Sequence, residues 1–395
     1  MDRSNPILTE CGEEFDRAVA AMSHDSFELY ERVAVTRRVE LDIAADRCHQ
    51  VDGVERGSAI RAGAAAPFVA SSGGIDQLLR RASSEMLERS SAAAWNLDAD
   101  NVVDLDRSAE MASGQEMESW LRRNASTELV ELRSVWAETA LTLECWSDGR
   151  HTQKRVRGRS WAAWSPREVG RMSARPLVAA ARNWRRLSDF DPDQAWRERE
   201  RHRGRAIPWP GGAAIVLSPD VSASLAYRLA LVLHAPSAQS GAEVGPGWRL
   251  FDRPLDRTAL FGSSRDDSGF PTSQVELADG ERTLNSWSRR GCERRGSYRD
   301  LPQPSPTCLE LIPPQVEVPS SAVWVTDLTV HPGAAGEWLL ELHARPYPEG
   351  VGIEPHWIRI RPAAIARSCL GAVGESRQGM QGVRTPALLF RPDFG

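Results

Sequence analysis

The side chains that could do chemistry in this chain are thinly spread. Asp266 and Asp267 form an acidic doublet just before Gly269. Adjacent residues of an extended segment point in opposite directions, so the two carboxylates are poorly placed to act together in acid/base catalysis. They are better placed to hydrogen-bond backbone groups of the loop or to position a substrate strand. Three histidines lie 12 and 13 residues apart on expected strands and loops and could converge only through the fold: His331, His343 and His356. No G-x-S-x-G elbow, phosphate-binding loop, dinucleotide fingerprint or H-E-x-x-H motif occurs.

The most informative segment runs from Ile215 to His234 and reads IVLSPDVSASLAYRLALVLH. Its first three residues form a short apolar, β-favouring run. Pro219 suits the first turn of a helix and Ser218 suits the N-cap before it, so a helix is predicted from about Asp220 to Leu233. His234 stands alone at the end of this helix, where a structural or capping role is favoured over a ligand role.

A second segment, Asp266 to Arg290, predicts a β-hairpin behind an acidic loop. Polar and apolar residues alternate from Ser273 to Leu277, and Asp279-Gly280 favours a tight turn. The stretch from Thr283 to Trp287 can return as the partner strand.

These two segments, in this order, resemble the TldD/TldE (PmbA) metalloprotease family. The acidic segment is similar to the family's Asp-(Asp/Ser)-Glu-Gly segment. The helix resembles the one on which one paralogue carries His-Glu-x-x-x-His, which supplies two zinc ligands and a general base. Counted from Pro219, the first His and the Glu of that motif fall on Tyr227 and Arg228, and the second His falls on Val232. None of the three offers zinc an imidazole, thiolate or carboxylate donor.

The family's third zinc ligand, a cysteine, falls near Ala372 or Val373 when the closing segment is aligned on Pro386. Cys369 is close in sequence, but a lone cysteine is more often a buried small hydrophobic residue. The resemblance therefore implies the TldE-type paralogue, which keeps the helix without the motif and binds no metal itself. It also implies that Tyr227, Arg228, His234, Asp266, Asp267 and Gly269 line a cavity or contact substrate.

The rest of the chain agrees with the family less specifically. Three C-terminal segments follow in family order: Cys308 to Ile312, Leu340 to Ile360, and Gly374 to Phe390. In the N-terminal half, strands are expected at Val33 to Asp42, weakly within Ser58 to Phe68, at Leu129 to Trp146 and at Gly158 to Trp164. Polar turn residues are expected at His49 to Gly57, and helices at Ile75 to Leu87 and Arg175 to Arg186.

Composition predicts a two-domain α+β protein. The chain has 395 residues, of which 41% are hydrophobic, enough for a sizeable core. The run RERERHRGR, Arg197 to Arg205, is followed by Pro208 and Pro210 and favours a solvated linker. We therefore expect a TldD/PmbA-like mixed sheet and helix domain over residues 1–205. A β-rich domain around a central apolar helix is expected over 206–395.

Charge and cysteine content exclude several classes of function. The net charge of −5 and the absence of a helix-turn-helix or stacking platform argue against nucleic-acid binding. Six scattered cysteines without a C-x-x-C pair favour reduced thiols. No signal peptide or membrane span is visible, so we expect a cytoplasmic location without membrane attachment.

Lys154 is the only lysine among 49 basic residues. Because arginine codons are GC-rich and lysine codons are not, this bias indicates a high-GC source such as an actinomycete. Such bacteria use relatives of the resembled family as peptide or amide hydrolases in natural-product pathways, including those of modified peptides and lincosamide antibiotics. This associational argument suggests a place in antibiotic biosynthesis.

Three functional hypotheses remain open at this stage. The resemblance implies a metal-free subunit of a heterodimeric zinc-dependent peptidase or amide hydrolase, whose TldD-like partner carries the zinc and whose shared cavity binds an extended peptide or amide. The chain could instead be a homodimeric, non-catalytic binding protein for a peptide or metabolite. A third hypothesis is an enzyme with a new mechanism that uses His234, Tyr227 or Arg228.

Overall fold

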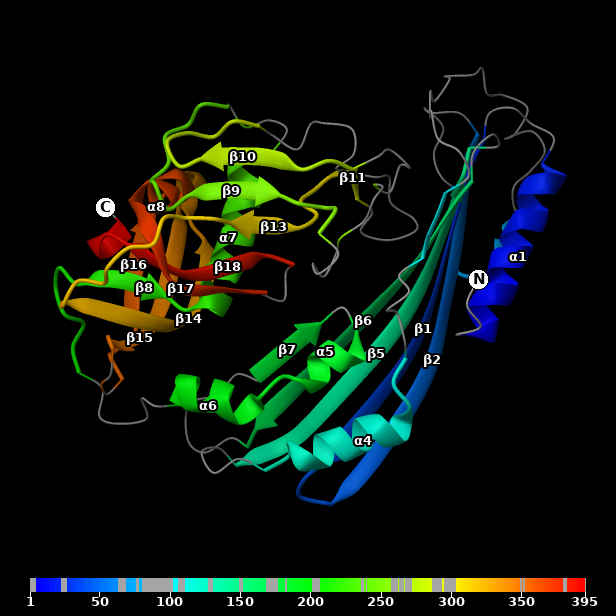
Figure 1. Cartoon of the computed structure of the whole chain (residues 1–395), viewed down its shortest axis with the longest axis horizontal. Coiled ribbons are helices and arrows are strands. Elements are labelled where there is room, and N and C mark those ends of the chain that lie inside the picture. The colour runs from blue at the N-terminus through cyan, green and yellow to red at the C-terminus, as the bar shows by residue number, and fades with distance from the viewer. Residues whose placement is uncertain are drawn as a thin grey trace. The chain divides into compact units, whose positions relative to one another are not determined.

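The computed structural model describes most of the chain. The described residues are 5–22, 27–62, 69–75, 78–79, 102–105, 111–126, 131–148, 152–167, 177–181, 183–200, 207–235, 238, 240–256, 262, 266, 272–285, 293–294, 303–348, 350, 352–378 and 382–394. They form two compact units (Figure 1). The first comprises residues 1–192 with 265–271 and 293–303, and the second comprises 193–264, 272–292 and 304–395. Both strands and helices are present in each, so the fold is α+β.

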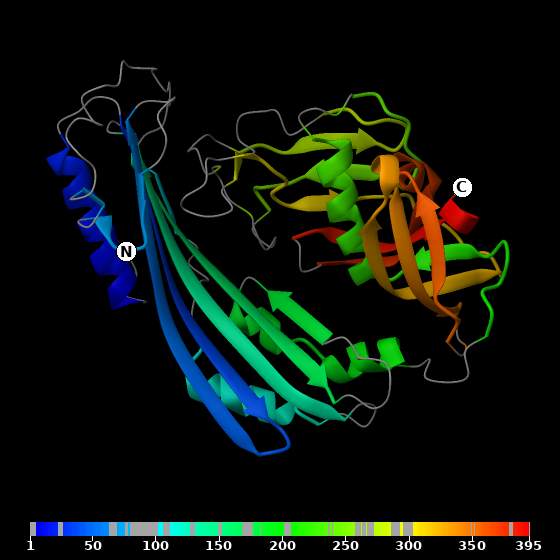
Figure 2. The same cartoon turned by 180° about the vertical axis from the view of Figure 1, so that it is seen from behind.

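The first unit is built on four long antiparallel strands, coloured blue to green and running side by side in Figures 1 and 2. They are β1 (Phe27–Asp42), β2 (Arg47–Ala62), β5 (Leu132–Ser147) and β6 (Thr152–Pro166). The strand order is β3-β2-β1-β5-β6-β4, with β7 also pairing β6. The short members are β3 (Val69–Ser71), β4 (Val102–Leu105) and β7 (Leu177–Ala181). Side chains alternate between the two faces of such strands, so each face has its own chemistry.

Two helices cover one face of this sheet. Helix α1 (Pro6–Ala21) starts at the N-cap Asn5, whose side chain accepts from the Ile7 amide at 3.1 Å, and buries Phe15 in a core with Leu29 and Leu143. Helix α4 (Gly114–Arg123) packs on β1 and β5. Two short helices follow, α5 (Trp184–Ser188) and α6 (Pro192–Glu200).

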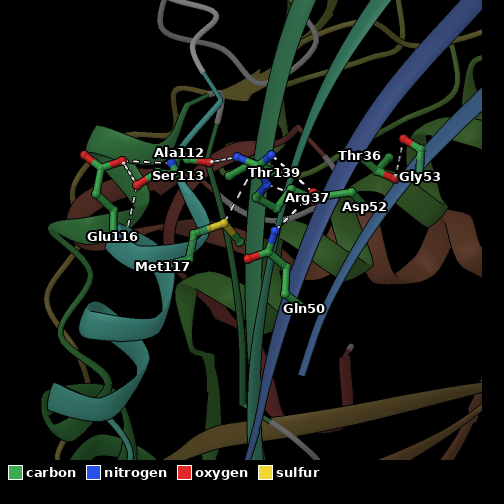
Figure 3. Close-up of polar contacts among 10 residues, drawn as sticks. All are labelled: Thr36, Arg37, Gln50, Asp52, Gly53, Ala112, Ser113, Glu116, Met117 and Thr139. Atoms are coloured by element: carbon green, nitrogen blue, oxygen red, sulfur yellow. Dashed lines mark hydrogen bonds and ion pairs between the residues drawn. The ribbon is translucent and has the colours of Figure 1, made fainter. Parts of the chain in front are cut away.

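The start of α4 is fixed by a set of polar contacts (Figure 3). The Ser113 hydroxyl accepts from the Glu116 amide at 3.2 Å, and the Glu116 carboxylate accepts from the Ser113 amide at 2.8 Å, which is a capping box. Arg37 donates to the Ala112 carbonyl at 3.2 Å and to both carboxylate oxygens of Asp52 at 2.8 and 3.3 Å. The helix is thereby held to the β1–β2 hairpin.

Two expectations for the first unit are wrong. Residues His49 to Gly57, expected as a polar turn, lie inside β2, which pairs with β1 over sixteen residues. Residues Arg175 to Arg186, expected as one helix, contain strand β7 and then α5, because Leu177–Ala181 pairs with β6. In both places cross-strand pairing overrides local preference. Of the helix expected at Ile75 to Leu87, residues 75, 78 and 79 are described and helical, and the rest lies outside the described residues.

The second unit is built on a mixed sheet in the order β10-β9-β13-β18-β8-β14-β15-β16, with β17 pairing β18. Its strands are β8 (Ala214–Leu217), β9 (Arg249–Asp252), β10 (Val275–Asp279), β13 (Leu309–Leu311), β14 (Ala322–Pro332), β15 (Trp338–Pro346), β16 (His356–Ile360), β17 (Cys369–Gln378) and β18 (Arg384–Phe390). Helices α7 (Pro219–Leu233) and α8 (Pro362–Ser368) contribute to the core. A separate two-stranded sheet joins β11 (Glu293–Arg294) and β12 (Gln303–Pro304). The second unit is therefore β-rich and contains the apolar helix α7, as expected from the sequence.

No described helix is long and apolar enough to cross a membrane.

Candidate functional site

The start of α7 is tied to the sheet as the sequence predicts. The helix begins at Pro219 after the N-cap Ser218, whose side chain makes no capping hydrogen bond. The Ser218 amide instead donates to the Val325 carbonyl of β14 at 3.0 Å. Inside the first turn, the buried Ser222 hydroxyl donates to the Leu217 carbonyl at 3.1 Å. These bonds fix the axis of α7 against β8 and β14.

The two faces of α7 differ in chemistry. Its buried face is apolar and reaches the core through Leu225, Ala226 and Leu229. On the other face Arg228 is exposed, Leu231 and Val232 are 41% and 45% exposed, and Tyr227 is half-buried. Arg228 makes no hydrogen bond or ion pair in the part of the chain that the structure describes. The outward face thus presents an unpaired guanidinium and two aliphatic groups, while Tyr227 packs against the core.

His234 closes the C-terminal end of α7 and is fully buried. Its amide donates to the Ala230 carbonyl at 3.0 Å, and its Nδ1 lies 2.8 Å from the Asn285 carbonyl oxygen. Because a carbonyl only accepts, Nδ1 carries the proton in this bond. Burial lowers the pKa of His234, and the bond to Asn285 partly opposes that shift. This geometry is consistent with the structural role favoured from the sequence.

The residues that receive His234 belong to the hairpin expected after Asp266. Strand β10 ends at Asp279, whose side chain accepts from the Glu281 and Arg282 amides at 2.9 Å each. Gly280 has φ 94°, the left-handed conformation that the Asp-Gly turn requires. The returning segment donates from Leu284 to the Leu277 carbonyl at 2.7 Å, and residues 286–292 lie outside the described part. The tight turn is as predicted, but the described returning residues form only an isolated bridge between Thr283 and Ala278 and not a strand.

The positions that correspond to the family's zinc ligands do not fit a metal. Tyr227, Arg228 and Val232 offer no suitable donor. On β17, Ala372 is buried and its amide donates to the Pro314 carbonyl at 2.7 Å. Cys369 is fully buried, and burial raises the pKa of its thiol, which favours the protonated form. Among the described residues, no three His, Cys, Asp or Glu side chains are arranged to hold a metal ion.

The acidic loop is described only at Asp266, which is buried. It belongs to the first unit, whereas α7 belongs to the second. Asp267 and Gly269 lie outside the described residues. The proposed cavity role of these three residues therefore stays a prediction.

The scattered histidines converge in part. Strands β14 and β15 bring His331 and His343 to the same carboxylate, with Nε2 to Glu341 oxygen distances of 3.6 and 3.2 Å. His356 lies apart, stacked on Trp209 and 3.5 Å from Asp393. Glu341 was not predicted as a site residue, because its contact with both imidazoles depends on strand register. The described residues around this carboxylate do not form a metal site.

With this geometry in place, comparison with solved structures defines the class of fold. The chain shares its fold with two structures described as candidate modulators of DNA gyrase. The one from Thermotoga maritima has a TM-score of 0.68 and 15% identity over 96% of this chain and 99% of that chain. The one from Bacteroides thetaiotaomicron has a TM-score of 0.64 and 12% identity over 98% of each chain.

The particular protein to which the chain is also similar is TldE from Thermococcus kodakarensis. That structure matches with a TM-score of 0.69 and 12% identity over 97% of this chain and 99% of its own. No protein-family model matches the sequence. No curated protein matches it significantly either. At these identities the structural matches establish the fold, which spans nearly the whole chain and not only the two segments that carry the sequence resemblance.

Proposed function

We propose that the chain is the TldE-like, metal-free subunit of a heterodimeric zinc-dependent peptidase or amide hydrolase. One observation carries the proposal. Helix α7 keeps the place after β8 where the resembled paralogue holds its zinc motif, yet it carries Tyr227, Arg228 and Val232 instead. A TldD-like partner would hold the zinc and the glutamate base, and this chain alone is expected to be inactive.

In this proposal the outward face of α7 is a wall of the shared cavity. The guanidinium of Arg228 is free to pair with a carboxylate of the substrate or partner, and Leu231 and Val232 offer apolar contact. His234 does not reach that wall, because it is buried and its Nδ1 is bound to the Asn285 carbonyl. This weakens the reading in which His234 drives a new catalytic mechanism. The substrate would be an extended peptide or amide bound by strand addition.

The composition suggests the kind of organism and pathway in which the chain works. The 48 arginines against one lysine support a high-GC bacterial source. In such bacteria a specialised partner in the biosynthesis of a natural product, acting in the cytoplasm, is the role that we propose.

The test is co-expression with a TldD-like relative encoded beside this chain, purified by a tag on this chain alone. We expect a one-to-one complex with about one zinc per heterodimer, and no zinc in the chain purified alone. Turnover of a peptide substrate should require both chains. An Arg228→Glu variant should assemble and bind zinc normally but lose turnover, whereas a change at Asp220, an exposed residue at the far end of α7, should not.

A metal-free homodimer that ignores the other gene product would contradict the proposal. It would favour the alternative, a non-catalytic binding protein for a peptide or metabolite. Zinc-dependent turnover by the isolated chain would contradict both readings.

A further inference from the structure

The sheet face of the first unit that is turned away from α1 and α4 carries an unpaired carboxylate. Glu138 on β5 is half-buried, and among the described residues it makes no hydrogen bond or ion pair. Burial raises the pKa of Glu138, and the charge of Arg38 partly opposes the shift. A carboxylate that is partly desolvated and unpaired gains free energy from any cation that reaches it.

Strand register identifies the neighbours of Glu138 on this face. Residues directly opposite in antiparallel strands share a face, and Glu138 is opposite Arg38 on β1 and Trp161 on β6. Trp136, two residues earlier on β5, lies on the same face and is opposite Ala163. Both tryptophans are half-buried. Glu138 and Ala163 thus occupy one diagonal of a four-residue square, and the two indoles occupy the other.

The spacing of this square suits a cation. Diagonal neighbours across an antiparallel pair have backbones about 7–8 Å apart, which is within reach of aromatic and other long side chains. A cation beside Glu138 could therefore be contacted by an aromatic ring. Ala163, at the other end of the diagonal from Glu138, is small and buried. In the next row on the same face, Thr36 lies opposite Ala140 and Gly53, and its hydroxyl donates to the Gly53 carbonyl (Figure 3). Arg159 on β6 lies opposite Ala140 in that row.

Arg38 does not neutralise Glu138. Its guanidinium lies 4.3 Å above the Trp136 ring and its Nη2 pairs with the Glu40 carboxylate at 3.2 Å. Arg38 and Glu40 therefore offset each other's charge, and the carboxylate of Glu138 keeps no partner among the described residues. Arg159, on β6 in the adjacent row, has a contact of its own, and His49 lies opposite Glu40. A cation is the kind of ligand that would pair with this carboxylate.

We propose that Glu138, Trp136 and Trp161 form a binding site for an organic cation, the ammonium or guanidinium group of an extended peptide. The carboxylate pairs with the charge, and the two indoles contact the cation and its aliphatic stem. Lysine and arginine side chains share this chemistry.

The test titrates the full chain with three probes of the form acetyl-Ala-Ala-Xaa-Ala-Ala-amide, where Xaa is lysine, arginine or the neutral, similarly sized norleucine. Binding is followed by ligand-observed NMR at low salt. We expect at least one cationic probe to bind about tenfold more tightly than the norleucine probe, and the lysine to arginine ratio identifies the preferred cation. Binding should weaken as the pH falls and Glu138 becomes protonated.

Matched variants locate the site. Glu138→Gln should abolish the advantage of the cationic probes, and Trp161→Leu should reduce it several-fold. Glu55→Gln is the control, because Glu55 lies on the same face of the sheet, opposite Ala34, and is exposed. Equal binding of all three probes, or an undiminished advantage in a folded Glu138→Gln variant, overturns the proposal. If that variant does not fold, Trp161→Leu and the pH series on the unaltered chain decide the question.

Discussion

Replacing His234 by asparagine and by leucine separates its hydrogen bond from its proton affinity. The imidazole is fully buried and its Nδ1–H donates to the Asn285 carbonyl at 2.8 Å. Asparagine keeps an N–H donor near the position of Nδ1 but does not titrate. Leucine fills similar space and donates nothing. The pair therefore tests whether the residue acts through the bond, through its charge, or through both.

The expected magnitudes follow from this geometry. Loss of the buried hydrogen bond in His234→Leu should cost about 1–3 kcal/mol of the free energy of unfolding. For a domain of this size that lowers the Tm by about 2–4 °C per kcal/mol. Because burial lowers the pKa of His234 from 6.5, the folded state binds fewer protons than the unfolded state below about that pH. The stability present above the unfolded pKa is then lost as the pH falls through the folded pKa, by at most about 1.4 kcal/mol per pH unit.

Urea unfolding at pH 8, 7, 6 and 5, followed by tryptophan fluorescence, measures both effects. At pH 8 we expect His234→Asn to match the parent and His234→Leu to be weaker. Between pH 6.5 and 5 both variants should lose less stability than the parent. The reasoning is refuted if the parent and His234→Asn show the same pH slope, or if His234→Leu equals the parent at pH 8.

Three further predictions use the same unfolding assay. Because burial raises the pKa of Glu138, its ionisation costs the folded state stability as the pH rises from about 4.5 through the folded pKa, so Glu138→Gln should equal or exceed the parent at pH 7; a clear loss at pH 7 would contradict this. Burial also opposes ionisation of Glu144, but the charges of Arg155, Arg157 and Arg32 hold its pKa well below the usual range. Glu144→Gln should therefore cost about 3–5 kcal/mol at pH 7, and the parent should lose this contribution as the pH falls below about 4.5; a neutral effect would show that the arginines find other partners. Ser113→Ala breaks the capping box of α4 and should cost about 1 kcal/mol, with faster hydrogen exchange confined to the first turn of that helix, and unchanged exchange there would refute the assignment.

The helix start and the tight turn could be predicted from the sequence, because each depends on a few adjacent residues. Pro219 after Ser218 marks the start of α7, and Asp279-Gly280 marks the hairpin. Strand β2 was missed over His49 to Gly57 because that stretch is polar, contains Gly53 and is exposed over most of its length. Only its pairing with β1 makes it a strand.

The site residues divide in the same way. The outward position of Arg228 and Val232 follows from helical periodicity once the start of α7 is known. The meeting of His331 and His343 at Glu341 depends on the register of β14 with β15, including the irregularity between Val325 and Asp327. Glu138 and Trp161 are 23 residues apart in the chain and face each other only through strand pairing. Sequence periodicity assigns faces within one element, but it does not align one strand with another.

The division of the chain into units also determines the order in which the parts of the first unit are synthesised. Residues 265–271 and 293–303 belong to the first unit, although most of the chain between 193 and 303 belongs to the second. A ribosome that has released residue 192 must translate about 110 more residues, on the order of ten seconds at bacterial rates, before the first unit has all its parts. All strands of the long sheet have then been made, since the last of them ends at Ala181, but the first unit still lacks two of its segments while the second unit is being synthesised. A fragment that ends between residues 192 and 265 should therefore form the sheet without those segments.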